Sequence, residues 1–136
     1  MKYLLDTCTI SDFVKGEKST LLRLKETPPF DIAISSITIM EIEYGLLLNK
    51  QRAEKIKGII YNFLNSLTIL PFTTETAEQA GVIRAALKHA GRPVGSYDLL
   101  IAATVVTNQL ILVTSNTQEF SHILNLTQEN WRGTSK

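Results

Sequence analysis

Lys2-Tyr3-Leu4-Leu5-Asp6-Thr7, at the start of the chain, is a short apolar run that ends in a carboxylate and a hydroxyl. Such a run predicts a strand covered on both faces, as in a parallel sheet. In open α/β sheets, ligand sites form beyond the carboxyl ends of the strands. Asp6 stands at such an end. We therefore expect a metal site there if other parts of the chain bring more carboxylates to the same place.

Strands alternate with helices along the rest of the chain. After the first strand, the pattern predicts strands at residues 32–34, 68–70 and 110–113, with a short edge strand at 124–127. It predicts helices at 9–14, 20–25, 37–48, 52–64, 74–90 and 97–107, with N-caps at Ser19, Ser35 or Ser36, Thr74 and Ser96. The alternation indicates an α/β fold with three layers, a central parallel sheet of four to five strands and helices on both faces.

Length and composition narrow the class of protein. A chain of 136 residues is expected to form one domain, 1–136, and its hydrophobic content of 44% is typical of a globular protein. Asp6 interrupts the first apolar run too early for a signal peptide, and no stretch is long enough to span a membrane. We expect a cytoplasmic protein. The net charge of +1 means that a nucleic-acid partner would need local basic patches.

Three of the thirteen acidic residues are out of place, because apolar residues flank them at structural spacing. Asp6 ends the first strand, and Asp98 lies in the first turn of a nearly all-apolar helix. Glu41 shares a helix face with Ile37, Tyr44 and Leu48, so it is expected within an apolar stripe. Glu119, just after a strand, is a fourth candidate. A helix cap or a solvated surface position would explain any one of these acids alone.

Clustered carboxylates need a cation. Several in a small volume repel each other, and some would take up protons unless a cation neutralised them. Oxygen ligands without His or Cys select Mg²⁺ or Mn²⁺, which activate water for displacement at phosphorus. Thr7, Ser115 and Asn116 are placed to orient the ligands or a bound water.

The whole chain resembles the PIN-domain ribonucleases, and within them the VapC-type toxins of toxin–antitoxin pairs. The matching segments are Leu4-Leu5-Asp6-Thr7, Ile34-Ser35-Ser36-Ile37-Thr38 with Glu41 and Tyr44-Gly45, Gly91-Arg92-Pro93-Val94-Gly95 with Asp98 to Ala103, and Val113-Thr114 with Asn116, Glu119-Phe120 and Trp131. The resemblance implies a Mg²⁺-dependent endoribonuclease that is usually dimeric and is silenced by a VapB-like antitoxin. Residues 91–98 look most like the branch that cleaves transfer RNA, including initiator transfer RNA.

By the same resemblance, Asp6, Glu41 and Asp98 match the metal-site acids of the family. Glu119 matches the last acidic position, where many members carry Asp, and Asn116 matches a polar residue near the metals. Cys8 departs from the pattern, because the family usually has Asn or Ser there. A thiol is a weak hydrogen-bond donor and would hold Asp6 or a water less well.

Two other functions remain open from the sequence. One is a catalytically inactive PIN-like module that binds RNA or protein. The other is a Mg²⁺-dependent phosphatase with Asp6 as nucleophile, although the usual pattern needs a second Asp at position 8, which is Cys. If the protein binds RNA, the phosphate contacts are expected from Lys15, Lys18, Arg23 and Arg92, for which solvated surface positions are the alternative. Trp131 is expected to be a packing anchor.

Overall fold

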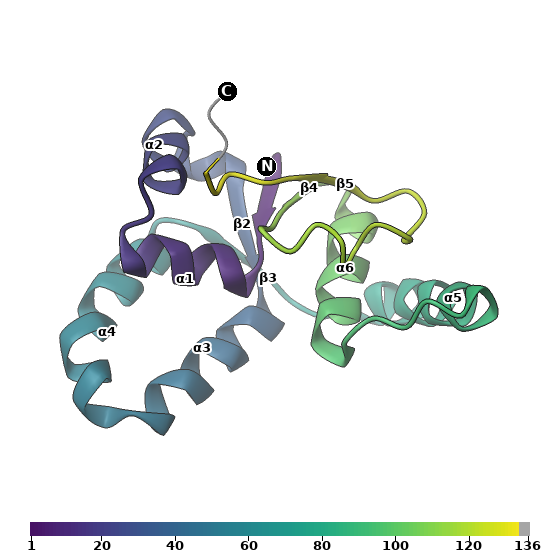
Figure 1. The fold of residues 1–136 in the computed structure, drawn as a ribbon, viewed down its shortest axis with the longest axis horizontal. Coiled ribbons are helices and arrows are strands. Elements are labelled where there is room, and N and C mark those ends of the chain that lie inside the picture. Colours follow the sequence, from purple (N-terminus) through teal and green to yellow (C-terminus); the bar gives the residue numbers. More distant parts are fainter. Residues whose placement is uncertain (134–136) are drawn as a thin grey trace.

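The computed structural model describes residues 1–133 and contains a five-stranded parallel sheet (Figure 1). The strands are β1 (Tyr3–Leu5), β2 (Ile32–Ser35), β3 (Thr68–Leu70), β4 (Ile111–Val113) and β5 (Thr127–Glu129). Their order across the sheet is β3-β2-β1-β4-β5, and every neighbouring pair is parallel. The predicted α/β fold with a central parallel sheet is confirmed.

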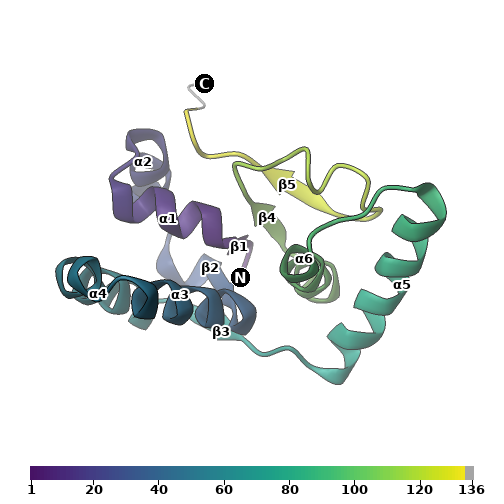
Figure 2. The same cartoon turned by 60° about the horizontal axis from the view of Figure 1, so that its bottom comes forward.

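Helices cover both faces of this sheet. They are α1 (Thr7–Lys15), α2 (Lys18–Glu26), α3 (Ser36–Leu48), α4 (Lys50–Asn65), α5 (Thr74–Ala90) and α6 (Ser96–Asn108), with a 3₁₀ turn η1 (Pro29–Asp31) before β2. Helices α1 to α4 lie on one side of the sheet and α5 and α6 on the other, as Figures 1 and 2 both show. The connection from α5 to α6 is short, so these two helices pack against each other.

The apolar run in β1 has no solvent-facing side. Leu4 packs into the core beneath α5 and α6, while Tyr3 and Leu5 pack into the core beneath α1 and α4. Leu4 and Leu5 are both 0% exposed. Successive side chains of a strand point to opposite faces, so a central strand with helices on both sides must be apolar throughout. This explains why the first run shows no alternation.

The chain order creates a switch point at the carboxyl ends of β1 and β4. From β1 the chain moves outward through β2 and β3, then returns to the other side of β1 with β4 and β5. The backbone N–H of Asp6 donates to the carbonyl of Val113 at 3.0 Å, so the two strand ends remain joined beyond the ladder. Ligands of open α/β sheets bind in the crevice at such a point.

Several predicted helix caps were wrong by one or two residues. The observed N-caps are Glu17 for α2, Thr73 for α5 and Gly95 for α6, whereas Ser19, Thr74 and Ser96 were expected. Ser35 caps α3 as predicted, since its side chain accepts from the N–H of Ile37. Adjacent hydroxyl or carboxyl residues can offer similar local caps, and the tertiary path of the chain selects between them.

The predicted edge strand at 124–127 was also misplaced, because β5 begins where that prediction ends. Asn125 has a φ of +66°, which a strand does not tolerate, and Leu124 is exposed. The actual strand is the polar segment Thr127–Glu129, which pairs with β4 in register. An edge strand needs little apolar content, since backbone pairing rather than burial holds it.

The apolar stripe expected on α3 is not its buried face. Thr38 and Ile42 are buried, whereas Tyr44 and Leu48 are 62% and 67% exposed. Figure 1 shows the reason: α3 and α4 form a hairpin that extends away from the sheet, so the second half of α3 packs mainly against α4. Glu41 is therefore half-buried at the rim of the core.

Across residues 1–133, we find no helix with the length and apolar character needed to cross a membrane.

Candidate active site

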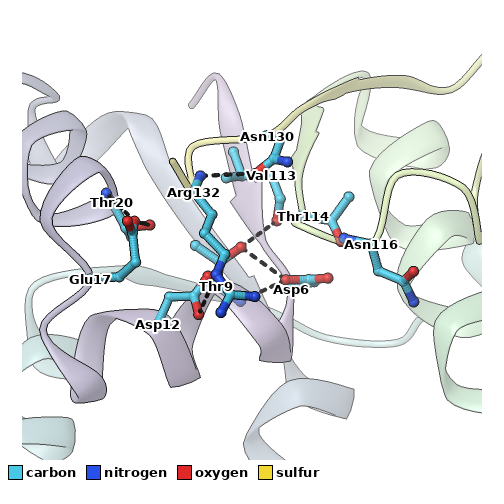
Figure 3. Close-up of polar contacts among 10 residues, drawn as sticks. All are labelled: Asp6, Thr9, Asp12, Glu17, Thr20, Val113, Thr114, Asn116, Asn130 and Arg132. Carbon is cyan, nitrogen blue, oxygen red and sulfur yellow. Dashed lines mark hydrogen bonds and ion pairs between the residues drawn. The ribbon is translucent and has the colours of Figure 1, made fainter. Parts of the chain in front are cut away.

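Asp6 occupies the N-cap of α1 at the end of the central strand (Figure 3). Its Oδ1 accepts from the backbone N–H of Thr9 at 2.8 Å and from the Thr9 hydroxyl at 3.0 Å. Burial raises the pKa of this carboxyl, while hydrogen bonds from Thr114 and Thr9 oppose the rise. The side chain is only 2% exposed. Asp6 is thus both a helix cap and a buried acid. The sequence analysis treated the helix cap as an alternative to a site acid, whereas the structure shows one side chain that is capping and buried at once.

Thr9 and Thr114 are site residues that the sequence analysis missed. The Thr9 hydroxyl also lies 2.9 Å from the carbonyl of Val113, so it links α1 to the end of β4. Both threonines are buried. Thr9 stands three residues after the cap, a spacing that predicts contact with the capping side chain. Thr114 directly follows β4, as Asp6 directly follows β1, and this position at a strand end could have indicated it.

Glu41 is held from the first turn of α1. The Thr7 hydroxyl donates to Glu41 Oε1 at 2.5 Å, and it also lies 3.2 Å from the Thr38 hydroxyl. Because α3 begins at the carboxyl end of β2, next to β1, its second turn brings Glu41 beside the end of β1. Thr7 therefore holds the Glu41 carboxylate in place, and its role at a metal site stays a prediction.

Asp98 and Glu119 meet at the N-terminus of α6. Burial, then the charges of Glu119, Asp6 and Glu41 together with a hydrogen bond to Glu119, raises the pKa of Asp98 to about 6. Glu119 Oε2 accepts from the backbone N–H of Gly95 at 2.8 Å. A Cβ at position 95 would lie 3.4 Å from Glu119 Oε2 and 3.5 Å from Asp98 Oδ2. Both carboxylates therefore lie close to the backbone at the start of α6.

The four predicted acids interact through their charges but do not form a closed cage. Within the described chain, 1–133, no three His, Cys, Asp or Glu side chains are close enough together as they stand to hold a metal ion. The donor set is nevertheless the one that Mg²⁺ or Mn²⁺ prefers, with carboxylate oxygens alone. Burial raises the pKa values of Asp6 and Asp98, and the charges of Glu119, Asp6 and Glu41 add to the rise at Asp98, so a divalent cation would favour the ionised carboxylates.

Cys8 lies at the edge of this cluster. Partial desolvation and the charges of Asp6, Asp98, Asp12 and Glu41 raise the pKa of its thiol to about 11. The thiol therefore stays protonated at neutral pH, and a protonated thiol is a poor nucleophile and a poor metal ligand.

The remaining predicted residues differ in their surroundings. Ser115 and Asn116 follow β4, and the N–H of Asn116 donates to the Thr114 hydroxyl at 2.9 Å, which turns the chain at the site. Of the predicted RNA-binding residues, Lys15, Lys18 and Arg92 are exposed. Arg23 forms an ion pair with Glu129 at 3.1 Å and lies over the Trp131 ring at 4.7 Å. Its guanidinium is thus already engaged within the protein.

We expect the metal-free protein to lose stability between about pH 4 and pH 7 through Asp98. The folded chain holds this proton up to about pH 6, whereas an unfolded chain releases it near the ordinary value of 3.8. The contribution is complete below the unfolded pKa and is lost as the pH rises through the folded one. Allowing for solvent screening of a half-exposed group, the loss is about 1 kcal/mol.

Unfolding in EDTA measured across this pH range, for wild type and Asp98→Asn, would check the expectation. The Asn variant cannot ionise, so its stability should fall less with pH. Equal slopes for the two proteins would contradict it.

Comparison with known proteins agrees with this geometry. The sequence profile of the PIN domain matches residues 3–124. The tRNA(fMet)-specific endonuclease VapC of Shigella flexneri is 33% identical over 131 residues, covering 96% of this chain and 98% of the relative.

Two solved complexes contain similar chains: VapBC2 from Rickettsia felis with a promoter DNA fragment, and DNA-bound VapBC from Salmonella typhimurium. Their TM-scores are 0.88 and 0.89 at 34% and 33% identity, over 96% of this chain and 99% and 98% of theirs. The chain belongs to the PIN-domain family, in its VapC branch.

Proposed function

We propose that this protein is the toxin of a toxin–antitoxin pair and acts as a metal-dependent endoribonuclease. The observation that carries the proposal is the convergence of Asp6, Glu41, Asp98 and Glu119 on the switch point between β1 and β4. Relatives across nearly the whole chain are named ribonucleases or endonucleases, which supports it. The chain would act as one domain, in the cytoplasm.

The four carboxylates would hold Mg²⁺ or Mn²⁺. Such an ion, when bound, activates a water and stabilises the charge that develops at phosphorus during hydrolysis. The protein's own contribution is to fix the ligands in advance. Thr9 and Thr114 hold Asp6, Thr7 holds Glu41, and the N–H of Gly95 holds Glu119. Asn116, exposed beside them, would orient water or the scissile phosphate.

Transfer RNA is the proposed substrate, with initiator transfer RNA as the first candidate. The name of the Shigella flexneri relative and the resemblance of residues 91–98 support it. An inactive binding module is disfavoured because all four acids are present and interact. A phosphatase with Asp6 as nucleophile is disfavoured because position 8 carries a protonated thiol in place of a second carboxylate.

A direct test incubates the purified chain, free of antitoxin, with a transfer-RNA pool. We expect discrete fragments with Mg²⁺ or Mn²⁺ and intact RNA with EDTA. Cleavage that persists in EDTA would overturn the metal-dependent mechanism, and intact RNA under all conditions would overturn the enzymatic function.

Thr7→Val should slow cleavage about 10- to 100-fold, which is typical when a group that orients a metal ligand is lost. Valine keeps the β-branched shape of threonine but cannot donate to Glu41, whose carboxylate would then be free to turn away. Thr7→Ser retains the hydroxyl and serves as the control. Initial rates on transfer RNA measure the effect. Equal rates for the Val and Ser variants would show that Thr7 does not position Glu41 for the reaction.

A VapB-like antitoxin is the proposed inhibitor. Solved complexes of similar chains are VapBC pairs. The excess of carboxylates invites an inhibitor that brings a cation, and a bidentate Arg suits carboxylates best. Beside Glu41 and Thr7, a groove of about 170 Å³ between α1, α3 and α4 would receive the apolar residues next to that Arg.

Replacing the candidate Arg of the antitoxin by Ala should weaken inhibition more than it weakens complex formation. Inhibition constants and complex affinities, measured on the same protein preparations, separate the two effects. Unchanged inhibition would argue that the antitoxin only blocks access.

We also propose a homodimer. Along α3, Tyr44, Leu47 and Leu48 are at least 62% exposed, and Met40 is 40% exposed, so within residues 1–133 this helix has a largely uncovered apolar face. Clustered exposed apolar residues mark interaction surfaces. Analytical ultracentrifugation would test this proposed dimer interface. Leu47→Glu places a charge in the apolar face, so the variant should contain a larger fraction of monomer than wild type.

A further inference from the structure

A second cavity borders the N-terminal end of α6 and is not lined by the four carboxylates. It has a volume of about 610 Å³ and lies between α5, α6 and the connection 91–95. Figure 2 shows these three segments forming one side of the molecule. We name it the α5–α6 groove, and its size is typical of ligand pockets. Leu87, Val94, Leu99 and Leu100 supply an apolar floor.

Three cations line this groove: Arg84, Lys88 and Arg92. All three are exposed, and no carboxylate lines the groove with them. Over the described residues, none of the three forms an ion pair. In a chain with 14 basic and 13 acidic residues, three cations without an acid in one cavity are a marked local concentration. The dipole of α5 would favour a cation at Lys88, which lies in the last turn of the helix. It does not account for the cations at Arg84 and Arg92.

The backbone holds the two later cations in fixed relation. Gly91 ends α5 with a φ of +68°, and its N–H donates to the carbonyl of Lys88 at 3.1 Å. The N–H of Arg92 then donates to the carbonyl of Leu87 at 2.9 Å. Arg92 therefore follows Lys88 around a rigid helix end. The backbone positions of residues 88 and 92 are thereby fixed relative to each other.

The groove and the carboxylate cluster share the start of α6. Ser96 lines the groove, while Gly95 binds Glu119 and Asp98 lies two residues further along. A polyanion near four carboxylates is repelled unless cations nearby hold it. The α5–α6 groove supplies such cations next to the site without contributing to the acid cluster.

We propose that the α5–α6 groove binds an unpaired nucleotide of the RNA substrate, with its base on the apolar floor and its phosphates beside Arg84, Lys88 and Arg92. The inference rests on the proposed nuclease function and adds a substrate-binding subsite to it. Recognition of single-stranded nucleic acid commonly combines a cationic track with aromatic side chains on which the base stacks. In the α5–α6 groove, aliphatic side chains would take that place. Sequence-specific RNA binding likewise targets bases that are not paired.

The first test measures RNA affinity in the full chain carrying Asp6→Asn, so that the RNA stays intact. Arg84→Ala with Lys88→Ala should weaken binding of the transfer-RNA pool roughly tenfold or more at low salt, because two charged contacts are lost. The slope of log K against log salt should become shallower by about 0.7 for each contact. Lys50→Ala with Lys55→Ala, which removes two exposed cations from α4, is the matched control.

The second test locates the base. A single-stranded RNA oligonucleotide containing 4-thiouridine, cross-linked by near-ultraviolet light, should label peptides within residues 84–100. The Arg84→Ala, Lys88→Ala pair should reduce that labelling, and an oligonucleotide with abasic sites should bind at least about fivefold more weakly than its parent. Labelling confined to other segments, or equal affinity for the abasic strand, would overturn the proposal.

The nuclease function can survive the failure of this inference. If wild type cleaves RNA and the groove pair behaves like the α4 control, the groove is not the subsite. If the salt slope changes only in the Lys15→Ala, Lys18→Ala variant, RNA binds on the α1–α2 side instead.

If the Arg84→Ala, Lys88→Ala variant binds the antitoxin more weakly but binds RNA with unchanged affinity, the groove is a protein-docking surface. Absence of cleavage by wild type would instead overturn the proposed function itself.

Discussion

Asp6→Asn and Asp98→Asn should each reduce RNA cleavage roughly a thousandfold or more, because each removes a carboxylate from the proposed metal site and with it electrostatic stabilisation of the proposed reaction. Asp6 is buried at the end of β1, and Asp98 faces Glu119 at the start of α6. Asparagine has nearly the same shape as aspartate and still accepts hydrogen bonds. At position 6 it therefore remains a good helix cap for the N–H of Thr9.

The same substitutions should leave the fold intact or make it more stable without metal. Burial, with a smaller contribution from neighbouring carboxylates, raises the pKa of both carboxyl groups, so ionising them costs more free energy in the folded chain than in water. A neutral amide removes that repulsion. Melting temperatures in EDTA at pH 7 should be equal to or above that of wild type, and added Mg²⁺ should raise the melting temperature of wild type more than that of either variant.

Glu78→Gln is the matched control, since it removes one exposed carboxylate from α5, away from the site. It should retain wild-type cleavage. Cleavage rates on transfer RNA at a fixed Mg²⁺ concentration separate the three variants. Full activity in Asp6→Asn or in Asp98→Asn would remove that acid from the proposed catalytic set.

Trp131→Ala should lower the free energy of unfolding by about 3–5 kcal/mol, as expected when a fully buried aromatic side chain is removed. The ring is 1% exposed and meets Tyr3 of the central strand edge to face, with centroids 5.2 Å apart. Its Nε1–H donates to Glu129 of β5 at 3.0 Å. Arg23 covers the ring from α2. The residue therefore joins the C-terminal segment to the first strand and to α2, and the prediction of a packing anchor is confirmed.

Urea unfolding of Trp131→Ala and Trp131→Phe separates packing from hydrogen bonding. Phenylalanine retains much of the buried area but lacks the N–H, so its loss should be smaller, about 1–2 kcal/mol. Since Trp131 lies in the core beneath α1 and α4, we expect both folded variants to cleave RNA below their unfolding transition. A loss under 1 kcal/mol for Trp131→Ala would contradict its role as an anchor.

The amino-acid sequence alone determined the α/β class and the four acids as candidates. An apolar run without alternation, as at Tyr3–Leu5, is stable only where helices cover both faces of a strand, so local composition already reports a central position. A carboxylate next to apolar residues, such as Asp6 or Asp98, is costly without a partner. Both signals can be recognised from neighbouring residues alone. The structure agrees with the first, because β1 is the central strand of the sheet.

Only the tertiary structure decided which surfaces the side chains occupy. Helical periodicity put Tyr44 and Leu48 with Glu41 on one face, but the α3–α4 hairpin extends beyond the sheet and leaves both apolar residues exposed. Arg23 looked available for RNA, yet Glu129, more than 100 positions later in the chain, binds its guanidinium. Arg84 and Lys88 gave no signal in the sequence, and only the packing of α5 against α6 and residues 91–95 shows that they line a groove. Free energies of burial and pairing depend on neighbours that are distant in sequence, and the path of the chain alone brings those neighbours together.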